Sequence, residues 1–345
     1  MKLTKYIHFA LIALLAVPAC KKNNVPVPKP DVDVYVAGQI SKITPGIHTL
    51  VAAYWKNGVS TTLSDNYWGN ANAITVVGTD IYVAGYIIVN DSLNNSITIG
   101  TYWKNGVATS LGPNTVCTSI VVKGTDVYVA GYSTPPPTNN NTGFDILTTN
   151  NRVGTYWKNG IATTLGSNTS CTSITVIGSD VYITGSINNS AAFWKNGIIT
   201  KLAGGHPDSW ANAIAVNGSD TYIIGTTGLN NGLPIAAYWR NGVITELTSV
   251  SPSIAQSVTV NGGDIYIAGS FNYRAAYWKN GVLNELPQDW TNLNSSIANA
   301  IAVNYNDVYL VGNLGLDAAY WKNWATPQLD QKYDAGINAI TIVPH

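Results

Sequence analysis

The stretch Tyr54-Trp55-Lys56-Asn57-Gly58 decides the fold of this 345-residue chain, because the sequence returns to it at a steady interval. An aromatic residue, Trp, Lys or Arg, Asn and Gly follow one another at six places, and a seventh copy has Trp324 where Gly is expected. The copies begin at Tyr54, Tyr102, Tyr156, Phe193, Tyr238, Tyr277 and Tyr320. Repetition at this period indicates stacked repeats, so it separates residues that build the fold from residues left over for function.

A second phrase lies between the copies of the first and consists of Asp, a mostly apolar residue, Tyr, two small or apolar residues and Gly. Its copies are 40 to 54 residues apart and begin at Asp33, Asp80, Asp126, Asp180, Asp220, Asp264 and Asp307. Propeller blades recur at about 40–50 residues. The repeat therefore overrides the two domains that the chain length alone would suggest.

Each repeat predicts four short strands, which in one unit are 213–216, 220–225, 236–240 and 243–247. The Asn-Gly pair between the last two is the preferred two-residue hairpin turn. Adjacent Tyr and Trp point to opposite faces of a strand, so both faces of each sheet need cover. Sheets stacked side by side in a ring supply that cover. The sequence predicts an all-β, seven-bladed β-propeller with four-stranded blades.

The two ends of the repeat region predict how the ring closes. The chain enters the repeat at Asp33, in a second strand, and ends with 337–342, which reads as a first strand. The C-terminal strand would complete the N-terminal blade, a one-plus-three closure.

The repeats resemble those of β-propellers from secreted bacterial proteins and lipoproteins, in which Trp-x-x-Gly precedes a Thr/Asp-Leu strand and Ala-Ile-x-Val-x-Gly precedes Val-Tyr-Val-x-Gly. The resemblance covers about 310 residues from Asp33 onward. It implies a propeller fold but no particular ligand, since fold does not specify function.

The first residues predict export. Lys2 and Lys5 precede a short apolar stretch, and Leu15-Ala16-Val17-Pro18-Ala19-Cys20 resembles the lipobox of a bacterial lipoprotein signal. Residues 1–19 are then a lipoprotein signal peptide, and 20–31 the lipidated Cys20 with a Pro-rich flexible linker. Residues 32–345 form the propeller. The predicted location is the bacterial cell envelope, as an outer-membrane lipoprotein on the periplasmic or outer side. An ordinary secretory signal is the alternative.

The net charge limits the classes of partner that the sequence predicts, and the cysteine positions indicate the state of the thiols. Loss of Lys2 and Lys5 leaves 16 basic and 18 acidic residues, a net charge of −2. Seven of those cations are spread through the repeats, so we expect no nucleic-acid partner and contact with the membrane through the lipid anchor only. Cys117 and Cys171 occupy a slot that holds Ala in other repeats, which predicts two free buried thiols.

Strand order sorts the loops onto two faces. The regular face holds the first-to-second turns, such as Val77-Gly78-Thr79, and the Lys-Asn-Gly turns. The irregular face holds the second-to-third and blade-to-blade connections. Its longest predicted loops are Gln39 to Leu50, Tyr86 to Ile97 and Tyr132 to Arg152. Variable loops on a rigid scaffold are where binding usually resides.

The Trp residues outside the repeat phrase point to the same face. Aromatic side chains with polar neighbours suit a glycan or peptide, because stacking provides area and polar groups fix orientation. The candidate ligand-binding residues are Trp68, Trp210, Trp290, Tyr67, Tyr333, Asp208, His206, Asp289 and Asp334. The alternative is that these aromatic residues cap the blade ends as hydrophobic lids.

Two further polar patterns favour structural roles. One polar residue per predicted innermost strand would form a ring of buried hydrogen bonds near the axis: Asn72, Thr118, Thr172, Asn212, Gln256, Asn299 and Asn338. Each repeat Asp follows a turn, where Asp commonly accepts amide hydrogens of that turn.

The sequence offers few residues that could act in catalysis. Once the signal peptide is removed, only His48 and His206 remain besides the terminal His345, and the only Glu residues are Glu246 and Glu285. No catalytic residues, cofactor or metal ligands are assigned. The favoured function is non-catalytic binding of a glycan, peptide or protein. The alternatives are a propeller glycoside hydrolase or lyase that uses loop-face Asp residues, and an outer-membrane assembly scaffold.

Overall fold

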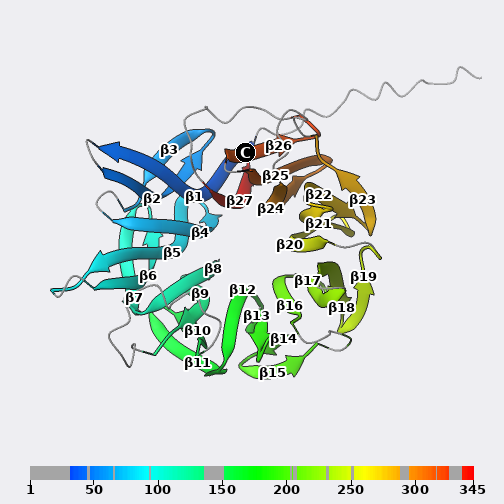
Figure 1. The fold of residues 1–345 in the computed structure, drawn as a ribbon, viewed down its shortest axis with the longest axis horizontal. Helices are drawn as coiled ribbons and strands as arrows, with labels where there is room; N and C mark the ends of the chain where they lie inside the picture. The colour runs from blue at the N-terminus through cyan, green and yellow to red at the C-terminus, as the bar shows by residue number, and fades with distance from the viewer. Residues whose placement is uncertain are drawn as a thin grey trace, which may run out of the picture. The chain divides into compact units, whose positions relative to one another are not determined.

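Seven antiparallel sheets stand in a ring around one axis in the computed structural model (Figure 1). The structure describes residues 32–44, 47–64, 67–92, 95–135, 151–202, 204, 208–230, 233–249, 252–287, 295–315, 317–325 and 336–345. The predicted all-β, seven-bladed propeller is confirmed. No helix long and apolar enough to cross a membrane occurs among these residues.

The strands are numbered along the chain, and each sheet is one blade. Blade 1 contains β27 (Ile337–Pro344), β1 (Val32–Thr44), β2 (Ile47–Lys56) and β3 (Val59–Thr62); blade 2 contains β4 (Trp68–Val77), β5 (Asp80–Asn90), β6 (Ser96–Lys104) and β7 (Val107–Pro113); blade 3 contains β8 (Thr115–Lys123), β9 (Asp126–Ser133), β10 (Val153–Lys158) and β11 (Ile161–Ser167); blade 4 contains β12 (Thr169–Ile177), β13 (Asp180–Ile187), β14 (Ser190–Lys195) and β15 (Ile198–Lys201).

The remaining blades follow the same order. Blade 5 contains β16 (Trp210–Asn217), β17 (Asp220–Asn230), β18 (Leu233–Arg240) and β19 (Val243–Glu246); blade 6 contains β20 (Ser253–Asn261), β21 (Asp264–Phe271), β22 (Arg274–Lys279) and β23 (Val282–Glu285); blade 7 contains β24 (Ser296–Asn304), β25 (Asp307–Leu314) and β26 (Asp317–Lys322). Blade 7 therefore has three strands within the described residues. The segment 326–335, which follows β26 and its turn, lies outside them.

Closure occurs at blade 1, as predicted. The last strand, β27, pairs antiparallel with β1, with Val36 opposite Ile340. The first strands of the blades lie next to one another around the axis in the order β27, β4, β8, β12, β16, β20 and β24, and β24 lies next to β27 again (Figure 1). Both described ends of the chain therefore belong to a single blade.

The repeat phrase builds the hairpin turn and the filling between blades. The Asn residues of the Lys-Asn turns have φ between 48° and 52°, and the Gly residues that follow have φ between 80° and 83°. These positive values are what a type I′ turn needs at both central positions. All seven repeat Trp side chains are at most 2% exposed. The interpretation of these Trp residues as inter-blade filling is confirmed.

A bulge in the innermost strand explains the Gly that ends the second phrase. In β16 the register with β17 shifts between Ala211 and Ala213. Opposite the bulge, a Cβ on Gly225 would lie 1.8 Å from the carbonyl oxygen of Trp210. Only Gly tolerates this approach. The same shift and the same contact recur in every other blade.

In blades 1 to 5 and in blade 7, the residue inside the bulge links the blade to the next one. The Asn212 Nδ2 amide of blade 5 donates to the Ala255 carbonyl of blade 6 at 2.7 Å. Equivalent bonds from a blade to its successor run from Asn72, Thr118, Thr172, Asn299 and Asn338. The bond from Asn338 to Ala71 crosses the closure between blades 1 and 2. The predicted polar ring is thus a set of side-chain-to-backbone bonds.

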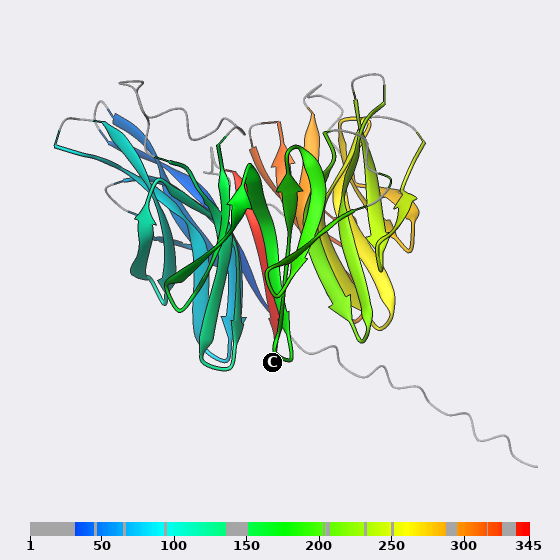
Figure 2. The ribbon, with the colours of Figure 1, turned by 90° about the horizontal axis from the view of Figure 1, so that it is seen from below.

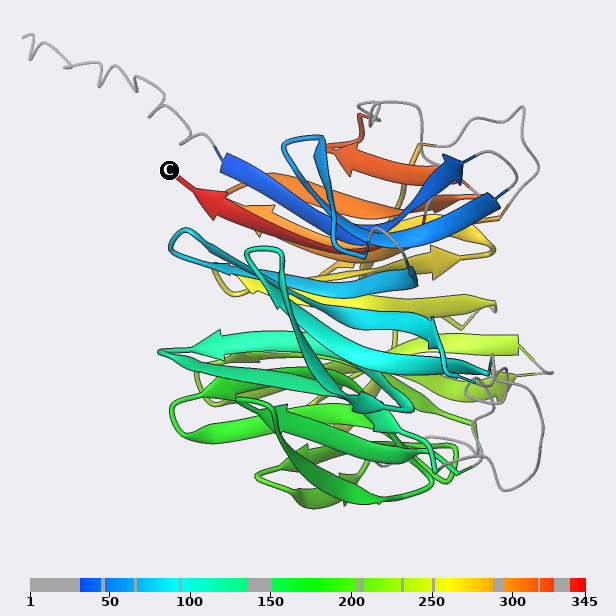
Figure 3. The same ribbon diagram turned by 90° about the vertical axis from the view of Figure 1, so that its left-hand side faces the viewer.

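The two faces differ as predicted, but two of the long loops are not loops. Strands β1 and β2 continue as a ladder to Thr44 opposite Ile47, and β5 and β6 continue to Asn90 opposite Ser96. Residues 39–44 with 47–50, and 86–90 with 96–97, therefore form extended ladders that project on the irregular face, opposite the C-terminus (Figures 2 and 3). The prediction was wrong because cross-strand pairing continues beyond the repeat phrase in both hairpins, and 86–89 is rich in residues that favour strands. The third segment, 132–152, is described only at its ends.

Candidate functional site

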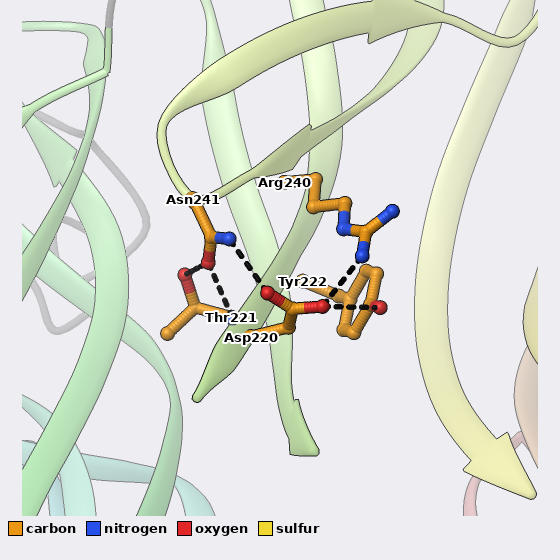
Figure 4. Close-up of polar contacts among 5 residues, drawn as sticks. All are labelled: Asp220, Thr221, Tyr222, Arg240 and Asn241. Carbon is orange, nitrogen blue, oxygen red and sulfur yellow. Dashed lines mark hydrogen bonds and ion pairs between the residues drawn. The ribbon is translucent and has the colours of Figure 1, made fainter. Parts of the chain in front are cut away.

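The regular face carries the same four-residue cluster in each of blades 1 to 6. In blade 5, Asn241 Nδ2 donates to Asp220 Oδ1 at 2.7 Å, and Arg240 Nη2 donates to Asp220 Oδ2 at 2.6 Å (Figure 4). The Asn241 Oδ1 accepts from the backbone N–H of Thr221 at 2.9 Å. The guanidinium carbon lies 5.6 Å from the centroid of the Tyr222 ring. The repeat cation is therefore held between a carboxylate and an aromatic face.

These clusters revise the role predicted for the repeat Asp. Asp33 accepts from Asn57 Nδ2 at 2.6 Å and pairs with Lys56 Nζ at 2.8 Å, so these two partners come from the opposite hairpin turn. Lys56, followed by Asn57, lowers the pKa of Asp33 to about 2. The same two kinds of partner lower the pKa of Asp80, Asp126, Asp180, Asp220 and Asp264. The Asp role remains structural.

The two cysteines have no reactive character. Cys117 and Cys171 are free and fully buried, as predicted. Burial raises the pKa of Cys117 strongly and that of Cys171 to about 12, so both stay protonated at neutral pH.

On the irregular face, the best-defined candidate segment is Asp208-Ser209-Trp210 at the start of β16. The Ser209 hydroxyl is 1% exposed and accepts from the backbone N–H of Ala191 in blade 4 at 3.0 Å. Asp208 has a φ of 70° and accepts from Asn189 Nδ2 at 3.4 Å. The segment is thus fixed to the β13–β14 hairpin. Trp210 nevertheless remains 39% exposed.

A second pair of candidate residues lies at the start of β4. Tyr67 and Trp68 are each 47% exposed. Trp68 is paired with Ile88, so it lies at the base of the extended β5–β6 hairpin. The backbone N–H of Tyr67 donates to the Ser64 carbonyl at 3.0 Å, and the Tyr67 carbonyl accepts from the Ser64 hydroxyl at 3.1 Å. The aromatic pair is held by a turn that is itself tied to blade 1.

The structure places these residues in two groups. Tyr67 with Trp68 belongs to blade 2, and Asp208 with Trp210 belongs to blade 5, three blades away around the ring. Each group carries aromatic area on the irregular face. Five predicted site residues lie outside the described residues: His206, Asp289, Trp290, Tyr333 and Asp334.

The structure adds aromatic residues that sequence reasoning missed. Tyr273 is 56% exposed, with a φ of 62°, at the tip of the β21–β22 hairpin on the same face. The signal was an Asn-Tyr pair where Asn-Gly is usual. Tyr132 is buried, and the Arg152 guanidinium carbon lies 4.1 Å from its ring centroid. No local pattern could have paired these two, because 19 residues separate them in the sequence.

The described residues offer no group of three or more His, Cys, Asp or Glu side chains that could hold a metal ion. Asp208 is the one predicted loop-face carboxylate within this part of the chain, since Asp289 and Asp334 lie outside it. What the arrangement supplies is exposed aromatic surface beside hydrogen-bonding groups, which suits binding.

Comparison with known proteins supports the fold. No family model and no curated relative matches the sequence. Among solved structures, the chain is similar to an acylaminoacyl peptidase from Pyrococcus horikoshii, with a TM-score of 0.52 and 11% identity over 86% of this chain. It is also similar to a puromycin-hydrolyzing peptidase from Mycobacterium tuberculosis, with a TM-score of 0.49 and 12% identity over 86% of this chain. A third similar structure is a chain of a nidogen/laminin complex, with a TM-score of 0.44 and 11% identity over 90% of this chain.

These likenesses differ in how much of the other protein they cover. The chain spans about half of each peptidase, 51% and 54%, but 98% of the chain from the nidogen/laminin complex. At 11% identity the P. horikoshii peptidase shows that the propeller fold is shared and nothing about activity.

Proposed function

We propose that this chain is a bacterial envelope lipoprotein whose propeller binds a ligand on its irregular face without turning it over. The observation that carries the proposal is the contrast between two sets of Trp residues. The repeat Trp side chains are at most 2% exposed, whereas Trp68 is 47% and Trp210 39% exposed, although rigid strands hold both. This exposure favours ligand contact over a role as hydrophobic lids.

The ligand class that fits best is a glycan. An indole face provides apolar area at little entropic cost, and neighbouring carboxylate and amide groups fix the orientation of hydroxyl groups. Asp208 and Asn189 supply such groups beside Trp210. A peptide or a protein segment with aromatic and amide groups is the second ligand class.

The predicted lipid anchor would be attached to the propeller through Val32. Val32 begins β1 at the regular face, beside the end of β27. A lipid on Cys20 would be joined to Val32 by the eleven residues 21–31, which reach at most about 40 Å when extended. The predicted tether would therefore join the propeller at its regular face. Mass spectrometry of the purified chain should find an acylated Cys20, and Cys20→Ser should abolish membrane retention.

The binding test is a panel of oligosaccharides and peptides measured for both binding and product. We expect Trp210→Ala and Trp68→Ala to weaken binding tenfold or more with unchanged melting temperature. Ile198→Ala is the matched control, because this side chain is 75% exposed on the regular face. Affinity that survives both Trp substitutions would contradict the proposed face. Cleavage of a panel member that disappears in Asp208→Asn would establish the alternative, a propeller hydrolase or lyase.

A further inference from the structure

Blade 7 departs from the repeat at both of its turns on the regular face. Trp324 has a φ of 72° at the position where the other six Lys-Asn or Arg-Asn turns have Gly. Tyr305 has a φ of 52° where the first-to-second turns of blades 2 to 6 have Gly at 60° or 61°. Side chains disfavour this backbone region, so an aromatic residue there is locally costly. The other blades fold with Gly, so the fold does not require these aromatics.

Trp324 lines a pocket between blades 6 and 7. The centroids of the Trp324 and Tyr277 rings lie 5.7 Å apart, and the two ring planes are inclined at 54° to each other. Beside this aromatic pair is a cavity of about 180 Å³, whose lining includes Lys279, Asn306 and Asn323. Trp324 is 47% exposed, so much of its indole remains accessible. The pocket is thus a second aromatic surface, on the face opposite to the one proposed above.

The polar groups of the pocket favour a neutral ligand. Lys279 Nζ is neutralised by Asp264 at 2.8 Å. The Asn323 side chain is fixed, because its Nδ2 donates to Asp307 at 2.6 Å and its Oδ1 accepts from the backbone N–H of Val308 at 2.9 Å. The exposed Asn306 amide can both donate and accept. Among the residues that line the cavity, Lys279 is the one charged side chain, and Asp264 balances its charge.

The size and shape of the pocket limit the class of ligand further. A volume of about 180 Å³ is below the range of roughly 300–1,000 Å³ typical for drug-sized ligands, so the pocket suits one ring. We propose that the Trp324–Tyr277 pocket is a saccharide-binding site that takes one neutral hexopyranose ring. The sugar packs its apolar face on the indole and its hydroxyl groups bond with Asn306. The source is either a free saccharide or the headgroup of a glycolipid.

The test uses the methyl glycosides of glucose, galactose, mannose and N-acetylglucosamine, with binding measured by saturation-transfer NMR and calorimetry. Trp324→Gly restores the repeat sequence and relieves the positive φ, so we expect binding to fall tenfold or more while the melting temperature stays the same or rises. Trp324→Phe should retain part of the affinity. Tyr305→Gly relieves the same backbone strain outside the pocket lining and should change binding less than threefold.

Vesicles distinguish the two sources. The Cys20→Ser chain is sedimented with phosphatidylcholine vesicles that contain or lack monogalactosyl diacylglycerol. Binding to the glycolipid vesicles alone assigns the sugar to a headgroup, and binding to free glycosides assigns a soluble saccharide. The proposal is overturned if neither probe binds or if Trp324→Gly binds as well as the natural chain. The proposal would also be overturned if Trp210→Ala loses saccharide binding while Trp324→Gly keeps it in full. That result would support the site on the irregular face.

Discussion

At the residue scale, the turn Asn of the repeat phrase has three separate tasks, as Asn196 illustrates. It adopts a φ of 52°, which Asn tolerates better than other residues with a side chain. Its Oδ1 accepts from the backbone N–H of Val181 at 2.8 Å, and its Nδ2 donates to Asp180 at 2.8 Å. One residue thus closes one hairpin turn and joins it to the neighbouring strand start.

Substitution of this Asn should be more harmful than an exposed turn position suggests. Asn196→Ala should lower the free energy of unfolding by about 1–3 kcal/mol, because two hydrogen bonds are lost and Ala disfavours positive φ. Urea denaturation followed by circular dichroism measures the change. Asn196→Gly is the control that keeps the backbone conformation and loses only the side-chain bonds, so its loss should be smaller. Equal losses in the two variants would show that the positive φ at this position contributes nothing to the free energy of unfolding.

The repeat Asp residues predict an acid limit to stability. In the folded chain the pKa values of six of them lie below the ordinary 3.8, at about 2 for Asp33: Asp33, Asp80, Asp126, Asp180, Asp220 and Asp264. A lowered pKa means that the folded state favours the ionised form, so the stabilisation is present above pH about 4 and is lost as pH falls toward 2. Melting temperature should drop steeply across that interval and less steeply in high salt. A flat profile from pH 4 to pH 2 would contradict the role assigned to these carboxylates.

At the element scale, neighbouring blades are joined by bonds that a single blade cannot form. Besides the bonds from the bulge residues, a buried hydroxyl at or just before the innermost strand of blades 2 to 7 accepts from the third strand of the preceding blade. The Ser253 hydroxyl, which is fully buried, accepts from the backbone N–H of Ala236 at 2.9 Å. Each innermost strand is therefore bonded to the preceding and the following blade.

The amide in the bulge can be tested at Asn212. Asn212→Ala removes the donor to the Ala255 carbonyl, which leaves a partly buried acceptor unpaired. We expect a loss of about 1–2 kcal/mol in the free energy of unfolding. Asn217→Ala, at the exposed end of the same strand, is the matched control and should change it by less than about 0.5 kcal/mol. A loss no larger than that of the control would mean that this bond does not hold the blades together.

At the scale of the whole molecule, the ring depends on its last strand. β27 pairs with β1, and the carbonyl of Ile337 accepts from Asn299 in blade 7. Removing residues 337–345 would leave blade 1 without its innermost strand and break the bonds to blades 7 and 2.

We expect that truncation to abolish the single cooperative melting transition and to produce aggregation in size-exclusion chromatography, because exposed strand edges pair with other chains. Removal of His345 alone is the control and should preserve the transition. A truncated chain that melts as sharply as the natural one would show that the ring does not need closure.

Most of the fold could be predicted from the sequence because the repeat phrases encode local requirements. Asn-Gly specifies a turn by its positive φ values, and adjacent Tyr and Trp require cover on both faces of a strand. The candidate site could be predicted only in part. Trp68 and Trp210 were found as the Trp residues that the repeat does not use, whereas Tyr273 and the Tyr132–Arg152 pair were missed.

The amino-acid sequence by itself determined the blade number, the closing strand and the separation of a regular from an irregular face, since each follows from a repeated local pattern. Only the tertiary structure decided that residues 39–44 with 47–50, and 86–90 with 96–97, extend as hairpin ladders, that each repeat Asp binds the Asn of an opposite turn, and that Trp324 meets Tyr277 beside a pocket. The Asp–Asn bonds and the Trp324–Tyr277 contact join residues at least 16 positions apart in the chain, and periodicity carries no information about such contacts. The hairpins extend outside the repeated phrases, where periodicity makes no prediction either.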